Sequence, residues 1–309
     1  MEKTNKKLQV NIGGVTLKNP IVTASGTFGF GKEYGEYFDL SRLGAICVKG
    51  LTLTPRLGNP PPRIAETPSG ILNSVGLQNP GVEAFVKHEL PHIKKYDTKV
   101  IANIAGNTVE EYCHMAQIIS KSETDLVEMN ISCPNVKQGG VAFGTDAEMV
   151  YHITHEVKKY CKQPLIVKLS PNVTDITQIA KAAESGGADA LSLINTLLGM
   201  SIDIHTKKPI LANNAGGLSG PAVKPVAVRM VWQVASAVKI PVIGMGGIMT
   251  GSDAIEFMLA GASAVAVGTA NFSDPLACVR ILEEVESYLD KYEISDINDI
   301  VGKVVVHGK

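Results

Sequence analysis

Cysteine pairs are the first feature that this sequence lacks. Its 309 residues include five cysteines, an odd number with no Cys-x-x-Cys pair, at Cys47, Cys113, Cys133, Cys161 and Cys278. This pattern argues against a disulfide framework, a zinc site and an iron–sulfur cluster. We therefore expect reduced thiols and no metal bound to this chain.

Excess charge and long apolar runs are also missing. The net charge is −1 and the pI is about 6.7, so there is no electrostatic signature of nucleic-acid or anionic-membrane binding. No run approaches the roughly 18 apolar residues of a membrane span, and the charged start leads into no signal-peptide-like stretch. These absences predict a cytoplasmic protein that binds neither nucleic acid nor membrane.

Aromatic residues are scarce at 5%, although 45% of the residues are hydrophobic. Burial must rest on Ala, Val, Ile and Leu, a composition typical of parallel strands covered on both faces. Eight short apolar runs, each followed by helical periodicity, predict an α/β fold, a single (β/α)8 TIM-barrel domain over residues 1–309. The runs are Ile21–Ala24, Ala45–Lys49, Val100–Ile104, Leu126–Asn130, Leu165–Leu169, Ala190–Ile194, Pro241–Met245 and Ala264–Gly268.

A doubly wound open sheet is the competing fold, and it requires a Gly-x-Gly-x-x-Gly fingerprint after the first strand. The nearest match, Gly29 to Gly35, is one residue too long. The second strand ends in Lys49 rather than in an acidic residue. The barrel is therefore favoured over the dinucleotide-binding fold.

Three segments fall outside the eight repeats. Residues 51–79 and 196–220 extend the second and sixth strand–helix loops, which lie on the carboxyl face of a barrel, where long loops serve active sites. Residues 8–17 predict a hairpin around Gly13-Gly14, placed at the bottom of the barrel.

Polar residues stand where the predicted strands end, and those ends converge on one face of the barrel. A lysine at such an inward position is costly to bury without a ligand, so Lys168 indicates a function. The strand-end residues are Ser25, Lys49, Asn103, Asn130, Lys168 and Asn195.

Glycines follow the last two strands, at Gly246-Gly247 and at Gly268-Thr269. In barrels these loops bind phosphate, because bare backbone N–H groups can approach the anion closely. The sequence therefore predicts a cofactor or substrate that carries a phosphate.

Three chemistries fit this face. Lys49 or Lys168 is a candidate Schiff-base nucleophile of a lyase, and a non-catalytic barrel that binds a phosphate ligand is a further alternative. The amides favour instead a planar, amide-rich ring such as a flavin or a pyrimidine. They belong to Asn73, Asn103, Asn130 and Asn195.

Cys133 differs from the other four cysteines, which fall in a strand or in helical patterns where burial is the default. It lies three residues past the fourth strand, at the catalytic face. A reference pKa of about 8.5 suits it to act as a thiolate base after a modest shift.

Four motifs, spread in order over residues 8 to 290, resemble the dihydroorotate dehydrogenases. They are Asn73–Gly81, Asn130–Val136, Val167–Pro171 and Gly244–Ile248. The resemblance implies oxidation of (S)-dihydroorotate to orotate in pyrimidine synthesis, with FMN across the barrel mouth. It also implies that Cys133 removes a proton from C5 while hydride leaves C6 for the flavin, and that Lys168 stabilises the charge that develops on the reduced ring.

The same resemblance assigns ligand contacts. It implies substrate contacts from Lys49, Asn73, Ser74, Val75, Gly76, Leu77, Asn130, Asn135, Asn195 and Thr196. It implies FMN contacts from Ser25, Lys49, Gly50, Asn103, Asn130, Lys168, Ile194, Gly220, Gly246, Gly247, Gly268 and Thr269.

The sequence of residues 133–144 is similar to that of class 1B enzymes, the NAD⁺-linked type. That class implies a partner subunit carrying FAD and a 2Fe-2S cluster, and a homodimer of catalytic chains within a heterotetramer. The absence of a dinucleotide fingerprint and of a cluster-binding cysteine set agrees with it. Class 1A, which uses fumarate, shares the cysteine and remains the alternative.

Overall fold

The computed structural model describes residues 7–132 and 143–308. Eight parallel strands close into a barrel in the order β10-β15-β16-β3-β4-β7-β8-β9, which confirms the predicted fold class. Each strand begins and ends within two residues of its predicted run. The barrel strands are β3 (Ile21–Thr23), β4 (Ala45–Cys47), β7 (Lys99–Ile104), β8 (Leu126–Asn130), β9 (Leu165–Lys168), β10 (Ala190–Leu193), β15 (Val242–Met245) and β16 (Ala264–Val267).

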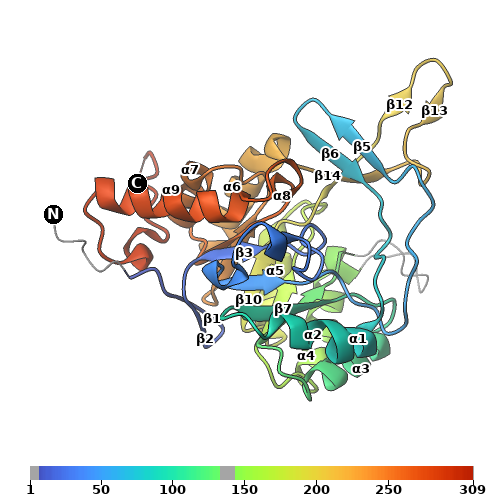
Figure 1. Cartoon of the computed structure of the whole chain (residues 1–309), viewed down its shortest axis with the longest axis horizontal. Coiled ribbons are helices and arrows are strands. Elements are labelled where there is room, and N and C mark those ends of the chain that lie inside the picture. The colour runs from blue at the N-terminus through green and yellow to red at the C-terminus, as the bar shows by residue number, and fades with distance from the viewer. Residues whose placement is uncertain (1–6, 133–142, 309) are drawn as a thin grey trace.

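Helices follow the strands and pack their apolar faces on the barrel (Figure 1). They are α1 (Val82–Ala84), α2 (Leu90–Ile93), α3 (Val109–Ile119), α4 (Ala147–Lys158), α5 (Ile176–Ser185), α6 (Lys224–Ala235), α7 (Gly251–Leu259), α8 (Ala270–Ser273) and α9 (Ala277–Lys291). A π-helical turn, Phe85–Glu89, joins α1 to α2, and short 3₁₀ turns cover Tyr34–Glu36, Leu40–Arg42, Phe143–Thr145, Pro221–Val223 and Ile297–Ile300.

Helix α3 shows how the sequence sets these elements. The Thr108 side chain accepts a hydrogen bond from the Glu111 backbone N–H at 3.2 Å and so caps the first turn. Two glutamates in that turn complement the positive end of the helix dipole. Tyr112, Met115 and Ile119 then recur at helical spacing on one buried face.

The two long insertions pair with each other, which the sequence did not predict. They form a four-stranded antiparallel sheet in the order β11-β14-β6-β5, here named the cap sheet. Its strands are β5 (Ile64–Thr67), β6 (Gly70–Asn73), β11 (Leu197–Gly199) and β14 (Gly216–Ser219). A narrow arm, β12 (Ile202–Asp203) and β13 (Lys208–Pro209), projects beyond it, on the side away from α9 (Figure 1).

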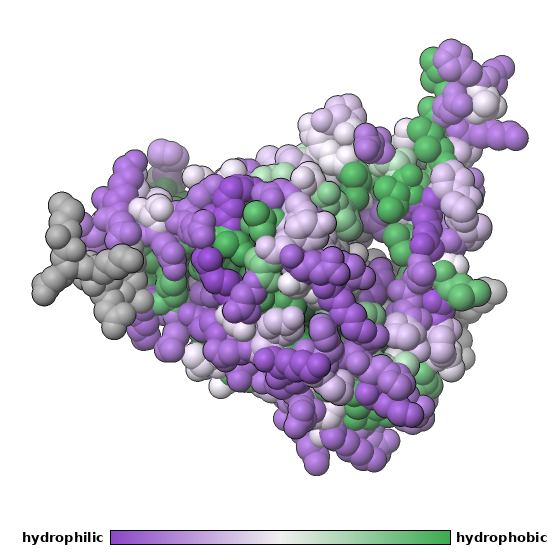
Figure 2. Space-filling model, in the orientation of Figure 1, coloured by the Kyte–Doolittle hydropathy of each residue, from purple (hydrophilic) through white to green (hydrophobic). Residues whose placement is uncertain are grey.

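Apolar side chains are exposed along this arm and its base. Figure 2 shows hydrophobic residues running from the cap sheet into the arm. The exposed residues include Leu198, Met200, Ile202 and Ile204. In the described part of the chain, no helix is long and apolar enough to span a membrane.

The predicted amino-terminal hairpin is confirmed as β1 (Val10–Ile12) and β2 (Val15–Leu17). A Cβ on Gly13 would lie 2.9 Å from the Cβ of Pro164 and 3.0 Å from that of Asp189. These two residues directly precede β9 and β10, so the hairpin packs at the amino ends of the strands. It therefore covers the end of the barrel opposite the strand-end residues.

Candidate active site

A carboxylate, Glu128 of β8, lies at the centre of a polar group inside the barrel. Its Oε1 atom accepts hydrogen bonds from Asn103 Nδ2 at 2.5 Å and from the Cys47 thiol at 3.3 Å. Its Oε2 atom accepts one from the Ser192 hydroxyl at 2.7 Å. Lys168 Nζ lies 3.8 Å from Oε1 as an ion pair. These five residues, named the floor cluster, come from five neighbouring strands of the barrel.

The floor cluster is buried. Glu128 is 3% exposed, Lys168 5% and Asn103 not at all. Buried charges are tolerated when they are paired and hydrogen-bonded, as they are here, and removing one partner leaves the other uncompensated. Burial, followed by the negative charge of Glu128, raises the pKa of the Cys47 thiol well above its ordinary value. Cys47 therefore stays a neutral donor to the carboxylate.

One atom of the floor cluster has no partner. Asn103 Oδ1 is buried without a hydrogen bond. A Cβ on Gly50 would lie 3.0 Å from this oxygen, 3.1 Å from Leu77 and 4.0 Å from the Ser25 hydroxyl. The structure thus brings together four of the predicted ligand-binding residues around a free acceptor. An acceptor of this kind fits a ring N–H of a bound ligand.

Lys49 follows β4 and reaches toward the same region. A Cβ on Gly26, after β3, would lie 3.6 Å from Lys49 Nζ. Burial, then the positive charges of Arg63 and Lys168, lowers the pKa of Lys49 below its ordinary value. The positive charges of Lys49, Arg63 and Lys168 together favour an anionic ligand in this region.

A chain of amides links the barrel to the cap sheet. Asn130 Oδ1 accepts a hydrogen bond from Asn195 Nδ2 at 3.0 Å, and Asn195 Oδ1 accepts one from the Thr196 backbone N–H at 2.8 Å. A Cβ on Gly217 would lie 2.0 Å from Thr196 Oγ1, and Asn73 Nδ2 donates to the Gly217 carbonyl at 3.4 Å. Four predicted substrate-binding residues therefore lie along one wall.

The predicted substrate contacts Ser74, Val75, Gly76 and Leu77 lie in the turn after β6. Leu77 has a φ of 55° and its carbonyl accepts a hydrogen bond from Asn79 Nδ2 at 2.7 Å. Asn59 holds the segment before it, since its backbone N–H donates to the Val75 carbonyl and its side chain to the Ser74 carbonyl. A Cβ on Gly76 would lie 2.6 Å from Asn59, so a side chain there has no room.

The glycine loops form a second part of the site. Gly246 and Gly247 have φ values of 127° and 78°, which favour glycine. A Cβ on Gly246 would lie 3.2 Å from Ile194, and one on Gly247 would lie 2.9 Å from the Gly220 carbonyl. In the neighbouring loop, which contains Gly268, the Thr269 hydroxyl is 2.8 Å from that of Ser219 in the cap sheet. Gly246 and Gly247 are thus packed against Ile194 and Gly220, and Thr269 contacts the cap sheet.

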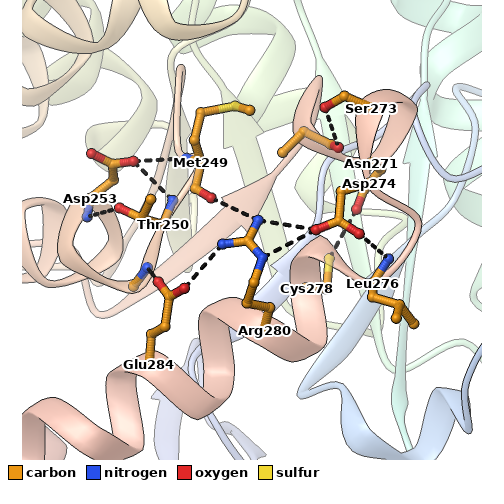
Figure 3. A network of polar contacts seen from close by, with 12 residues as sticks. Met249, Thr250, Asp253, Asn271, Ser273, Asp274, Leu276, Cys278, Arg280 and Glu284 are labelled. Atoms are coloured by element: carbon orange, nitrogen blue, oxygen red, sulfur yellow. Dashed lines mark hydrogen bonds and ion pairs between the residues drawn. The ribbon is translucent and has the colours of Figure 1, made fainter.

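Arg280 of α9 braces the loop after β15 and the turn after α8 from outside (Figure 3). Its guanidinium donates to the Met249 carbonyl at 3.2 Å and to the Asp274 carboxylate at 3.1 Å. It also donates to Glu284 at 3.1 Å, and Glu284 accepts from the Gly251 backbone N–H. Arg280 therefore ties the loop after β15 to the loop after α8.

Two predicted residues, Cys133 and Asn135, lie outside the described residues. The other predicted contacts lie at the carboxyl ends of the barrel strands or in the cap sheet and its turns. Sequence reasoning missed Glu128, although one signal was available. A single acid inside the apolar run Leu126–Asn130 is as costly to bury as Lys168 and needs a partner in the same way.

An apolar cavity elsewhere contains none of the predicted site residues. It has a volume of about 640 Å³ and lies between α6, α7 and the carboxyl-terminal segment. Its walls include Trp232, Ile255, Leu259 and Tyr288. The polar convergence at the strand ends, with its unpartnered acceptor, is the stronger candidate for catalysis.

A closed parallel barrel with two lysines, hydrogen-bonded amides and two glycine loops at its carboxyl face is typical of an enzyme that acts on a small anionic ligand. The family model described as dihydroorotate dehydrogenase matches residues 7–289. The chain belongs to the dihydroorotate dehydrogenase family.

Two curated relatives, both named dihydroorotate dehydrogenase B (NAD(+)), catalytic subunit, resemble the chain over nearly its whole length. One, from Alkaliphilus oremlandii (strain OhILAs), is 63% identical and covers 97% of this chain and 100% of that protein. The other, from Alkaliphilus metalliredigens (strain QYMF), is 62% identical and covers 98% and 100%. A crystal structure of DHODH in complex with ferulenol from Eimeria tenella has a TM-score of 0.81, 24% identity and coverage of 98% and 90%, and shows the shared fold.

Proposed function

We propose that this chain is a class 1B catalytic subunit that oxidises (S)-dihydroorotate to orotate in pyrimidine synthesis. The observation that carries the proposal is the convergence of Lys49, Lys168 and the amides around one unpartnered buried acceptor. That arrangement suits a planar ring with N–H and carbonyl groups and an anionic charge. The names of the relatives, which specify this enzyme, support it.

The residues fit FMN, which accepts a hydride from C6 of the substrate when bound. Asn103 Oδ1 is a free acceptor for a ring N–H, and Lys168 supplies a fixed cation beside it. The glycine loops present backbone N–H groups where the phosphate would bind. Gly50 leaves room next to Asn103 that a larger residue would fill.

The chain's own residues divide the remaining work. Cys133 acts as the general base and takes the proton from C5 of dihydroorotate onto its thiolate. Asn130 and Asn195, already bonded to each other, orient the substrate ring, and Lys49 pairs with its carboxylate. Lys168 stabilises the negative charge that develops on the cofactor side.

Electrons then leave through a partner. The relatives are named catalytic subunits, which supports a separate partner chain. We assign FAD and a 2Fe-2S cluster to that subunit, NAD⁺ as the final acceptor, and a cytoplasmic heterotetramer built on a homodimer of one-domain catalytic chains. Co-purification tests this assignment. An NAD⁺-linked activity that requires an iron–sulfur flavoprotein is expected, whereas fumarate-linked turnover by the chain alone would place it in class 1A.

The activity has a direct spectroscopic test. Purified protein should be yellow with bound FMN, and anaerobic dihydroorotate should bleach the flavin absorption. A colourless protein that neither binds FMN nor responds to dihydroorotate would refute the proposal.

A Cys133→Ala variant tests the base. It should keep FMN and lose roughly 10²–10⁴-fold in the rate of flavin reduction at neutral pH, the usual contribution of a general base. Cys113→Ala is the matched control, because Cys113 is half-buried on α3. Equal reduction rates in the two variants would remove Cys133 from the mechanism.

A further inference from the structure

The mechanism above uses Lys168 and Asn103 but not the carboxylate that holds them. Glu128 is 3% exposed, and each of its four neighbours presents a donor. An ionised carboxylate is an acceptor only, so the pocket is built for a negative charge. Burying that charge next to a predicted flavin site is costly, which points to a role beyond packing.

The first consequence concerns the orientation of Asn103. Because its Nδ2 atom donates to Glu128, its Oδ1 atom must face the opposite way, toward Gly50. That oxygen is the buried acceptor without a partner. Glu128 therefore decides which end of the amide meets the cofactor.

The second consequence concerns charge. Lys168 Nζ lies 3.8 Å from the carboxylate, so the negative charge offsets much of the lysine's field. Lys49 and Arg63 add positive charge from the side of β4 and the cap sheet, and Cys47 stays neutral because its pKa is raised. Glu128 is the negative group of the floor cluster, and it opposes the accumulation of electrons on a ring bound there.

We propose that Glu128 is a positioning residue that presents the Asn103 oxygen to FMN and, through its negative charge, lowers the reduction potential of the bound flavin. The inference rests on the proposed function. A lower potential makes reduced FMN a stronger donor to the next carrier, which an enzyme that ends in NAD⁺ requires. The two electrons and the proton follow the route already described.

Glu128→Gln isolates the charge. With the glutamine oxygen at the Oε1 position, Asn103 and Cys47 keep their acceptor, and the new NH₂ group at the Oε2 position donates to the Ser192 hydroxyl. Shape and hydrogen bonds are kept while the negative charge is removed. Glu128→Asp keeps the charge but, with a side chain shorter by one methylene, moves it away from Asn103 and Lys168. Ser192→Ala removes one hydrogen-bond donor and leaves the charge in place.

The experiment measures the midpoint potential of FMN in the full-length purified chain by anaerobic dye equilibration. Glu128→Gln should favour reduced FMN by at least about tenfold, which is about 30 mV for a two-electron couple. Glu128→Asp should show a smaller rise, and Ser192→Ala, which keeps the charge but loses one hydrogen bond to it, should shift the potential by less than either Glu128 variant. If the glutamine variant does not fold, Glu128→Asp carries the test alone.

The outcomes separate this inference from the function beneath it. A wild-type chain that binds no FMN refutes the proposed function. A chain that binds FMN, but whose potential is unchanged or lower in the Glu128 variants, overturns the role given to Glu128. A rise in Ser192→Ala equal to that in Glu128→Gln would also overturn it, because packing rather than charge would then set the potential.

Discussion

The floor cluster and the cap sheet border the same site but are held by opposite kinds of contact. The floor cluster consists of buried side chains from five neighbouring barrel strands, each bonded or ion-paired to Glu128. The cap sheet is joined by backbone pairing between two insertions, and its strand β11 exposes Leu198. We therefore expect changes in the floor cluster to alter cofactor chemistry and changes in the cap sheet to alter substrate binding.

The sharpest test of this division is Lys168→Met. Removing the cation leaves Glu128 buried and unpaired and takes away the charge that stabilises the reduced ring. Flavin reduction by dihydroorotate should slow by roughly 10²–10³-fold, the usual loss for one electrostatic group. Stopped-flow absorbance measures it. Lys181→Met, on the exposed face of α5, is the control and should behave as wild type.

Lys49 lies between the two regions, and loss of its charge should have the next largest effect, on orotate binding. Its pKa is lowered, so it loses its proton below the ordinary value of 10.5. The charged form attracts the carboxylate of orotate, so affinity should be present at neutral pH and fall about tenfold as the pH rises through the lowered pKa. Flavin difference spectra report orotate binding. Lys49→Met should bind weakly at every pH, and a wild-type affinity that stays constant up to pH 10.5 would contradict this role.

The cap sheet is tested by Gly70→Ala. A Cβ at residue 70 would lie 2.0 Å from the Ser219 carbonyl oxygen, so β6 and β14 must separate. Overpacking of this kind costs about 1–3 kcal/mol. The KM for dihydroorotate should rise about five- to tenfold, while FMN content and potential stay unchanged. Gly14→Ala, at a φ of 94° in the hairpin at the opposite end of the barrel, strains the backbone without contacting the cap sheet and so controls for a general loss of stability. A changed midpoint potential of FMN in Gly70→Ala would contradict the assignment of cofactor chemistry to the floor cluster and of substrate binding to the cap sheet.

Arg280→Ala should give the smallest effect. Its ion pairs are partly exposed, and such pairs contribute about 0.2–1 kcal/mol. Loosening the loop after β15, which contains Gly246 and Gly247, should weaken FMN binding about two- to fivefold while riboflavin, which lacks the phosphate, binds as before. Fluorescence titration of the apoprotein measures both. Arg229→Ala is the matched control, because the Arg229 guanidinium on α6 donates to Gln233 one turn further along the same helix. Equal losses of affinity for FMN and riboflavin would show that Arg280 stabilises the fold in general rather than the phosphate end of the site.

The strands of the floor cluster were predictable from sequence, and so were Lys168 and Asn103 as site residues, but Glu128, Cys47 and Ser192 were not, nor was the cap sheet. Strands buried on both faces are continuous apolar runs, so Leu126–Asn130 was placed correctly and its end residue with it. The cap sheet depends on pairing between residues far apart, such as Asn73 and Gly217, and no local pattern specifies such a partner. Cys133 lies outside the described residues, so its role stays a prediction.

The protonation of the cysteines makes the protein convenient for chemical labelling. Burial is the main cause that raises the pKa of Cys47, Cys113, Cys161 and Cys278, to about 12 for the last two. Thiols in this state react slowly with alkylating reagents near neutral pH, because the thiolate is the reactive form. Rapid alkylation of the native protein would therefore report on Cys133, and protection by orotate would follow ligand binding without any measurement of turnover.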